Sequence, residues 1–285
     1  MAWVRRELNT LGVPPLRRFG QHFLTDEKIR QELVKLGEPT IQDVVLEVGP
    51  GLGFLTSRLA ENAGRVIAVE KDRTFAAYLK KKFSSHQNIT IMEGDVLKIT
   101  LPDYDKIISS PPYNISSKLV LMILDSKYKL AALLLQEEFA RILTSESGSS
   151  DYGRLTVMFQ TRAQARFVAK IPKSAFYPKP KVDSAIVTIT PKDEEPQIRN
   201  RELFTDLVRS LFTQRRRKLS GVLARYLKNR YPGDASILLH NITSSEKRVY
   251  EVTPKEFVTY SNQITDTLSE IERDKTDSQS DSART

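Results

Sequence analysis

The sequence contains no cysteine and only three histidines among its 285 residues. Without cysteine the chain has no disulfides, thiolate nucleophiles or thiolate metal ligands, which is typical of a protein in the reducing cytoplasm. The histidines lie far apart without paired spacing, so no metal site is expected. No run of about 18 apolar residues is present, and the first residues lack a hydrophobic signal core. Neither a membrane span nor secretion is therefore expected.

Basic residues outnumber acidic ones in this chain, which has a formal net charge of +9 at pH 7. Residues 199–262 carry 13 Lys/Arg against 6 Asp/Glu, whereas residues 263–285 carry 3 against 6. A short segment that holds most of the positive excess predicts a polyanion-binding surface. The hydrophobic content of 40% is that of an ordinary globular protein, and the length suggests one large domain with a smaller one.

The most distinctive stretch is residues 110–113, Ser-Pro-Pro-Tyr, which ends a predicted strand over 105–109. Proline fixes φ and cannot donate a ladder hydrogen bond, so the strand must stop and the loop is stiff. The Ser110 hydroxyl and the Pro111 carbonyl could accept both N–H groups of an exocyclic amine, while Tyr113 stacks on the base. Such acceptors would help to localise the lone pair of adenine N6 by positioning and electrostatics. A simple proline-rich turn is the alternative.

A second motif at residues 43–56 predicts a strand, a glycine-rich loop and a helix, which is how a doubly wound sheet begins. A further strand over 65–69 ends at Glu70, which is placed to accept from both ribose hydroxyls of an adenosine ligand. The glycine spacing at 49, 51 and 53 does not match the pyrophosphate fingerprint, which excludes a dehydrogenase. Glu47 would repel phosphates and suits a ligand with a cationic amino group, such as S-adenosylmethionine.

Two further strand patterns complete the predicted sheet. A strand over 89–92 is followed by Asp95, which could accept from the adenine amino group of the cofactor, with Val96 beside the ring. An ordinary turn aspartate is the alternative for Asp95. A strand over 130–135 runs into a helix over 137–143. Five such units in order predict an open α/β sheet with both faces covered.

The segment 176–184 lies between two predicted strands, 166–171 and 185–189. Its prolines hold it extended, and its aromatic pair has no helical or strand face to fill. Phe176 is therefore a candidate for the second wall of a base pocket. The alternative is a hydrophobic plug under a loop.

The remaining chain gives the expected domain organisation. Thr25 is a plausible N-cap for a helix over 26–37, and Thr253-Pro254 begins a last helix. We expect four parts: a basic extended arm over 1–18, an α/β domain with the S-adenosylmethionine site over 19–195, a helical basic domain that binds a polyanion over 196–265, and a disordered acidic tail over 266–285.

Eight motifs resemble those of the ribosomal RNA adenine N6-dimethyltransferase family, in the family's order. They are FGQHFL (19–24), EVGPGLGFLT (47–56), VIAVEKD (66–72), EGD (93–95), PPYNISS (111–117), YGRL (152–155), FYPKPKVDS (176–184) and FTQRRRKL (212–219). Together they cover roughly residues 17–262. The basic C-terminal domain is more similar to the branch that modifies small-subunit rRNA than to the branch that gives macrolide resistance.

The resemblance implies a fold, a reaction and a set of site residues. The fold is a seven-stranded Rossmann-like domain dependent on S-adenosylmethionine, with a small all-helical C-terminal domain. The reaction is dimethylation of two adjacent adenines near the 3′ end of small-subunit rRNA during ribosome biogenesis, with S-adenosylhomocysteine as the product. The partners are rRNA and the small ribosomal subunit or its precursor, and we expect a cytoplasmic monomer.

The candidate site residues fall into three groups. The cofactor group, with Glu47, Gly51 and Val96 added from the loops above, is His22, Leu24, Glu47, Gly49, Gly51, Glu70, Asp95, Val96 and Ser110. The target adenine meets Ser110, Pro111, Tyr113 and Phe176. Candidate RNA-binding residues are Arg215, Arg216, Arg217, Lys218, Lys179 and Lys181.

Two positions depart from the family pattern. The family usually has Asn where His22 stands, and its catalytic loop normally begins with Asn, where this chain has Ser110. A serine hydroxyl is shorter than a carboxamide and can donate as well as accept. Amine-directed methyltransferases more broadly resemble the pattern Asp/Asn/Ser-Pro-Pro-aromatic, which this loop satisfies. We therefore expect an active enzyme with a reduced rate.

Two other functions stay open. An N6-adenine DNA methyltransferase would share the loop and the cofactor site, but it would carry a separate target-recognition domain that this chain lacks. A non-catalytic assembly or transcription factor on the same scaffold is supported only by Ser110. The intact acidic residues Glu47, Glu70 and Asp95 argue against it.

Overall fold

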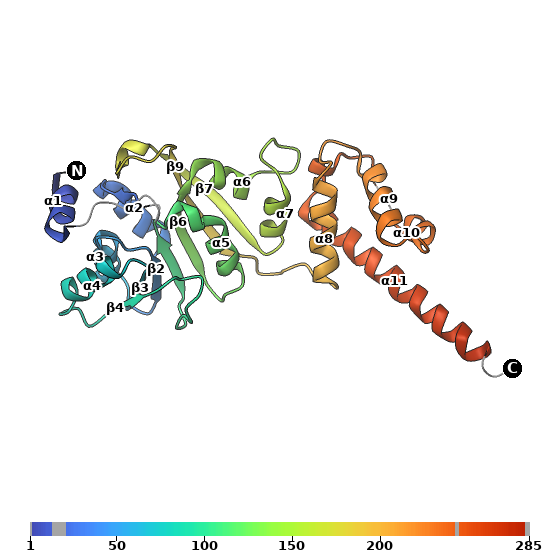
Figure 1. Cartoon of the computed structure of the whole chain (residues 1–285), viewed down its shortest axis with the longest axis horizontal. Helices are drawn as coiled ribbons and strands as arrows, with labels where there is room; N and C mark the ends of the chain where they lie inside the picture. The colour runs from blue at the N-terminus through green and yellow to red at the C-terminus, as the bar shows by residue number, and fades with distance from the viewer. Residues whose placement is uncertain (1, 13–20, 243–244, 283–285) are drawn as a thin grey trace. The chain divides into compact units, whose positions relative to one another are not determined.

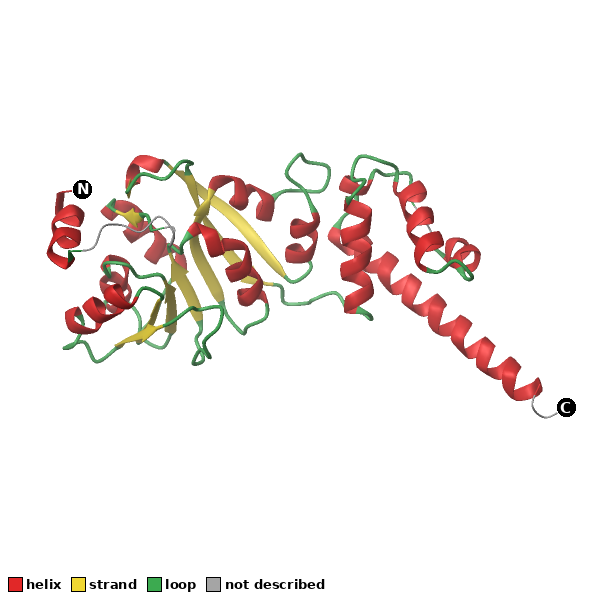
Figure 2. Cartoon of the chain, viewed as in Figure 1, coloured by secondary structure: helices red, strands yellow, loops and turns green. Residues whose placement is uncertain are grey.

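The structure is a computed structural model and describes residues 2–12, 21–242 and 245–282. Residues 1 and 13–18 of the expected arm and the last three residues of the expected tail lie outside this range. The chain divides into two compact units, Met1–Thr144 with Ala163–Lys192, and Ser145–Arg162 with Asp193–Thr285. Strands belong to the first unit, and the second is helical (Figure 2).

A seven-stranded sheet of order β4-β3-β2-β5-β6-β9-β7 forms the first unit (Figure 1). The strands are β2 (Val44–Val48), β3 (Arg65–Glu70), β4 (Ile89–Glu93), β5 (Lys106–Ser109), β6 (Leu130–Gln136), β7 (Ala163–Ile171) and β9 (Ser184–Pro191). The first five are parallel, and β9 is antiparallel to both β6 and β7. The predicted α/β sheet is confirmed.

Helices of this unit pack against the sheet or cover its loops. They are α1 (Ala2–Leu11), α2 (Glu27–Gly37), α3 (Phe54–Ala60), α4 (Arg73–Lys82), α5 (Ser116–Leu124) and α6 (Glu137–Thr144). A separate two-stranded ribbon joins β1 (Phe23–Leu24) to β8 (Phe176–Tyr177). Because the central strands β2, β5 and β6 are parallel and consist mostly of buried residues, they need cover on both faces.

Ser109, the last residue of β5, fixes the Ser-Pro-Pro-Tyr loop (residues 110–113) to the neighbouring strand β2. The Ser109 hydroxyl donates to the Val48 carbonyl at 2.7 Å and accepts from the Val48 N–H at 3.2 Å. Ser109 is fully buried, so these bonds are shielded from water. They hold the start of the Ser-Pro-Pro-Tyr loop beside the glycine-rich loop, at the carboxyl edge of the sheet where ligands bind in such folds.

A buried ion pair lies at the amino-terminal ends of β2 and β5, opposite the ligand edge of the sheet. Lys106 Nζ lies 3.0 Å from Asp43 Oδ2, and both side chains are buried. Asp43 also accepts from the N–H and the hydroxyl of Thr40, both at 2.8 Å. The exposed Lys129 pairs with Asp43 at 3.5 Å from the rim. The two buried charges thus satisfy each other away from the ligand edge.

The second unit has one apolar core built from five helices. These are α7 (Arg154–Gln160), α8 (Arg201–Phe212), α9 (Leu219–Arg230), α10 (Ala235–Asn241) and α11 (Pro254–Ser282). Residues 145–162, expected in the α/β domain, group with this unit. Tyr152 explains the grouping, because it is fully buried in this core and donates to the Val252 carbonyl at 2.7 Å.

Three local expectations differ from the structure. Residues 2–11 form helix α1 instead of an extended arm, because Val4 and Leu8 pack into an apolar cluster with Phe75. The N-cap of α2 is Asp26, whose carboxylate accepts from the Lys28 N–H at 2.9 Å. The hydroxyl of Thr25, the predicted cap, donates instead to the Ala175 carbonyl.

The acidic tail is the third difference. Helix α11 continues to Ser282, although the composition predicts disorder from residue 266. Ile271 is buried and Lys275 pairs with Asp234 at 3.0 Å, so this part of the helix packs on the unit. In the part of the chain that the structure describes, no helix combines the length and apolarity needed to cross a bilayer.

Candidate active site

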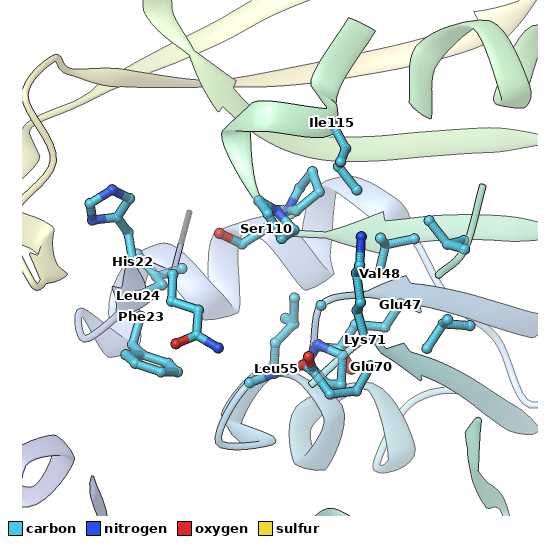
Figure 3. Close-up of a pocket in the computed structure, with 18 of the residues that line it drawn as sticks. His22, Phe23, Leu24, Glu47, Val48, Leu55, Glu70, Lys71, Ser110 and Ile115 are labelled. Atoms are coloured by element: carbon cyan, nitrogen blue, oxygen red, sulfur yellow. Dashed lines mark hydrogen bonds between the residues drawn. The ribbon is translucent and has the colours of Figure 1, made fainter. Parts of the chain in front are cut away.

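One cavity lies at the carboxyl ends of β2, β3 and β5, and Figure 3 shows the residues around it. All nine candidate cofactor residues and three of the four candidate adenine residues line it. They are His22, Leu24, Glu47, Gly49, Gly51, Glu70, Asp95, Val96, Ser110, Pro111 and Tyr113. Residues from five separate segments of the sequence therefore meet in one place.

Glu47 is a buried carboxyl group on the floor of this cavity. One of its oxygens, Oε2, has no hydrogen-bond partner among the described residues. Burial raises its pKa to about 8; the Thr56 hydroxyl opposes this shift and the charge of Glu70 adds to it. A buried carboxyl oxygen without a partner offers a place for a ligand ammonium.

Glu70 shapes the glycine-rich loop. Its carboxylate accepts from the Gly51 N–H at 3.2 Å and from the Asp72 N–H at 2.9 Å. Burial raises its pKa, while these backbone N–H groups oppose the shift. An ionised carboxylate has about four lone-pair sites, so two remain for ribose hydroxyls.

Asp95 is held by protein partners at the rim of the cavity. Its carboxylate accepts from Lys71 Nζ at 2.9 Å and from the Leu97 N–H at 3.1 Å. The hydrogen bond from Lys71 is the main reason that the pKa of Asp95 lies below its ordinary value. The carboxylate is thus ionised and oriented, with lone pairs left for an amino group.

The glycines of the loop bring the walls of the cavity close together. Gly49 has φ +71°, and a Cβ there would lie 2.8 Å from Pro112 Cδ. Gly51 has φ +56°, and a Cβ there would lie 2.9 Å from the Phe23 ring. Both positions need glycine for conformation and for space. The loop therefore touches the catalytic loop on one side and the segment 21–24 on the other.

Ser110 and Pro111 offer two oxygens at this edge. The Ser110 hydroxyl makes no hydrogen bond with any described residue, and Figure 3 shows the Ser110 oxygen pointing toward the side where His22 and Leu24 lie. No described backbone N–H donates to the Pro111 carbonyl. Both acceptors predicted from the sequence are thus uncommitted and belong to residues that line the cavity.

Tyr113 is the aromatic member of the site. Its ring centroid lies 5.6 Å from that of His22 with the planes 27° apart, and 6.5 Å from that of Phe176 at 71°. Its hydroxyl lies 2.5 Å from the Ser184 hydroxyl. The part-exposed ring therefore has a fixed plane beside the cavity.

Phe176, the predicted second wall of a base pocket, does not line this cavity. It is 1% exposed, packs in the core with Leu33 and Ile171, and is absent from the cavity lining. Its ring contacts the Tyr113 ring in a T-shaped arrangement. The β1–β8 pairing places Phe176 opposite Leu24, and the two side chains belong to the same apolar cluster. In this structure Phe176 is part of the core, and the His22 ring is the one stacked on Tyr113.

Two basic residues near the cavity were missed. Arg30 lines it, donates to the Leu24 carbonyl at 2.6 Å, and stacks 5.5 Å from the ring centres of Trp3 and Phe54. Lys82 donates to the Leu52 carbonyl at 2.7 Å and lies 4.5 Å from the Phe54 ring centre. A cation on the buried face of a predicted helix is the sequence signal that could have found Arg30.

The candidate RNA-binding residues have different environments. Arg215 is part-buried and donates to the carbonyls of Ser149 and Ser150. Lys218 is exposed but pairs with Glu246 at 2.6 Å. The four exposed residues whose side chains form no ion pair with the described residues are Arg216, Arg217, Lys179 and Lys181. Arg215 therefore stabilises the helical unit by holding the backbone at Ser149 and Ser150. The other five candidate side chains are exposed to solvent.

Comparisons with known sequences agree with this geometry. A family model described as ribosomal RNA adenine dimethylase matches residues 16–266. A Pyrococcus abyssi protein named probable ribosomal RNA small subunit methyltransferase A is 39% identical over 252 residues, covering 87% of this chain and 91% of that protein. A Methanosarcina mazei protein of the same name is 38% identical over 250 residues, covering 87% and 92%.

Solved structures show the same likeness. A dimethyladenosine transferase from Plasmodium falciparum has a TM-score of 0.77 at 27% identity, covering 86% of this chain and 98% of that chain. The 23S rRNA methyltransferase ErmE has a TM-score of 0.65 at 30% identity, covering 85% and 99%. These matches confirm the predicted Rossmann-like methyltransferase fold with a C-terminal helical region.

Proposed function

Since this chain belongs to the ribosomal RNA adenine dimethylase family and dimethylates adenine in rRNA, we propose that its targets are two adjacent adenines near the 3′ end of the small-subunit rRNA. The relatives named for the small subunit are 38–39% identical to it, whereas ErmE, named for 23S rRNA, is 30% identical. A monomer that acts in the cytoplasm on the small subunit or its precursor is part of the same proposal.

The cavity residues fit the cofactor that this family and fold imply. S-adenosylmethionine, when bound, supplies a methyl group on a positively charged sulfur. Glu47, with its unpartnered buried oxygen, would hold the amino group, and Glu70 would accept from the ribose. Asp95 and Val96 would bind the adenine end. The glycine-rich loop leaves room between these groups because Gly49 and Gly51 carry no side chain.

The protein's part in the reaction is to hold and orient the target amine. The Ser110 hydroxyl and the Pro111 carbonyl accept its two N–H groups, which turns the nitrogen lone pair toward the cofactor side of the cavity. Tyr113 stacks on the base, at about 1–3 kcal/mol per ring, and this offsets part of the cost of extruding it. No covalent intermediate or strong base is required.

This proposal rests on one observation. The oxygens of Ser110 and Pro111, which make no hydrogen bond with the described residues, line the same cavity as the unpartnered carboxyl oxygen of Glu47. The test supplies labelled S-adenosylmethionine with four substrates: immature small subunits, their naked rRNA, 23S rRNA and double-stranded DNA. We expect dimethyladenosine at two neighbouring positions of the small-subunit rRNA, mapped by primer extension. Label only on DNA would favour the DNA methyltransferase. No cofactor binding in calorimetry would favour a non-catalytic factor.

Cofactor binding should strengthen as the pH rises from 6 to 8. With its pKa raised to about 8, Glu47 is protonated in the free protein below that pH. An ammonium ligand favours the ionised carboxylate, so binding releases a proton, and affinity rises by up to about tenfold per pH unit. Calorimetry with S-adenosylhomocysteine measures this slope. In Glu47→Gln the slope should disappear and the affinity should fall; an unchanged slope would contradict the role of Glu47.

We also propose that the helical unit binds RNA phosphates through Arg216 and Arg217, which are exposed and unpaired among the described residues. Replacing both by Ala should weaken rRNA binding and reduce the slope of log affinity against log salt by about 1–2. The matched control is Lys228→Ala/Lys255→Ala, which removes the same charge from exposed positions of the same unit. An equal effect of both pairs would indicate net charge alone.

A further inference from the structure

The segment 176–184 supports two residues of the active site from outside the cavity. The carbonyl of Pro178 lies 2.7 Å from His22 Nδ1, and the hydroxyl of Ser184 lies 2.5 Å from the Tyr113 hydroxyl. Neither Pro178 nor Ser184 lines the cavity. The segment therefore acts on the site through His22 and Tyr113.

Ser184 is the more firmly fixed of the two supports. It is the first residue of β9 and pairs with Gln136 of β6 on one side and Ile171 of β7 on the other. It is also fully buried. Its hydroxyl thus has a defined position within the sheet, and it cannot itself touch a base or a cofactor.

Tyr113 needs such a fixed point at the end of its side chain. Its backbone follows two prolines, which restrict the loop at the other end. The rings of His22 and Phe176 flank it, but ring contacts alone allow tilting within the gap. The hydroxyl bond adds the constraint that defines the ring plane.

We propose that Ser184 is a positioning residue for methyl transfer: by holding the Tyr113 hydroxyl, it sets the plane on which the target adenine stacks. The inference rests on the proposed stacking role of Tyr113. A small tilt of that plane moves N6 away from the line of transfer, which lowers the rate more than it lowers RNA binding.

A double-mutant cycle tests this. Ser184→Ala and Tyr113→Phe each remove one end of the hydroxyl pair and keep the ring, so each should lower kcat about 2- to 10-fold, with KM and the affinity for S-adenosylhomocysteine nearly unchanged. The double variant should be no slower than the slower single variant, because both changes remove the same bond. Ser184→Thr retains a hydroxyl and should recover part of the rate.

The control is Ser261→Ala, which removes a buried serine hydroxyl that has no partner in the described structure and lies in α11 of the helical unit. It should leave kcat unchanged. Multiplicative losses of kcat in the double variant would overturn the inference. If Ser184→Ala folds poorly, Tyr113→Phe alone decides: a Tyr113→Phe enzyme with native kcat would also overturn it. Failure of the native protein to methylate adenine would instead reject the proposed function.

Discussion

Ser110→Ala is expected to lower the rate of methyl transfer about 10²- to 10³-fold, the loss seen when one preorganised hydrogen-bonding group is removed at a reacting centre. The Ser110 hydroxyl lines the cavity and has no partner among the described residues. Without it, one N–H of the target amine has no acceptor and the lone pair is not directed. Single-turnover kinetics at saturating S-adenosylmethionine measure the chemical step, and calorimetry with S-adenosylhomocysteine measures any change in cofactor binding.

The matched control is Ser110→Asn, which introduces the residue usual in the family. Its carboxamide oxygen still accepts, so this variant should keep most of the activity or exceed the native rate. A Ser110→Ala enzyme as fast as the native one would show that Ser110 does not contact the amine. Equal losses in both variants would point to loop packing instead of the hydroxyl.

Asp43→Ala is expected to lower the free energy of unfolding by about 3–5 kcal/mol, because the buried Lys106 ammonium loses its carboxylate partner and retains only the Glu38 carbonyl. The two charged groups are 3.0 Å apart, and both are buried. Urea unfolding measures the loss. The control, Lys129→Ala, removes the exposed partner of the same carboxylate and should cost about 0–1 kcal/mol. Similar losses in the two variants would contradict the assigned role of the buried pair.

The acid dependence of stability should change in the same variant. Burial alone would raise the pKa of Asp43, but the hydrogen bonds from Thr40 and Lys106 lower it to about 2. The unfolded chain, with a pKa of about 3.9, therefore binds more protons, so stability falls as the pH drops from about 4 to about 2. Asp43→Ala should show a shallower loss over this window in unfolding experiments at several pH values.

Much of the sheet and its ligand edge could be predicted from local sequence. Apolar runs that end at Gly49, Glu70 and Ser110 indicate parallel strands, and such strands bring their carboxyl ends to one edge. The structure places all three residues around one cavity. The prediction succeeded because each position follows directly from the end of its own strand.

The features that were missed depend on contacts distant in sequence. Phe176 could not be assigned to core or cavity from local sequence, because its burial depends on contacts with residues such as Leu33, far away in the chain. Tyr152 joins its segment to the helical unit through a bond to Val252, a hundred residues away. For the tail, composition predicted disorder. In the structure, however, Ile271 is buried and Lys275 forms an ion pair with Asp234 of the same unit.

The most direct test of the account is a crystal structure of the protein with S-adenosylhomocysteine and a short RNA that carries the target adenines. We predict that N6 of one adenine lies within about 3.2 Å of both the Ser110 hydroxyl and the Pro111 carbonyl, with its ring on Tyr113. An adenine bound outside this cavity, or these two oxygens turned away from N6, would contradict the central claim.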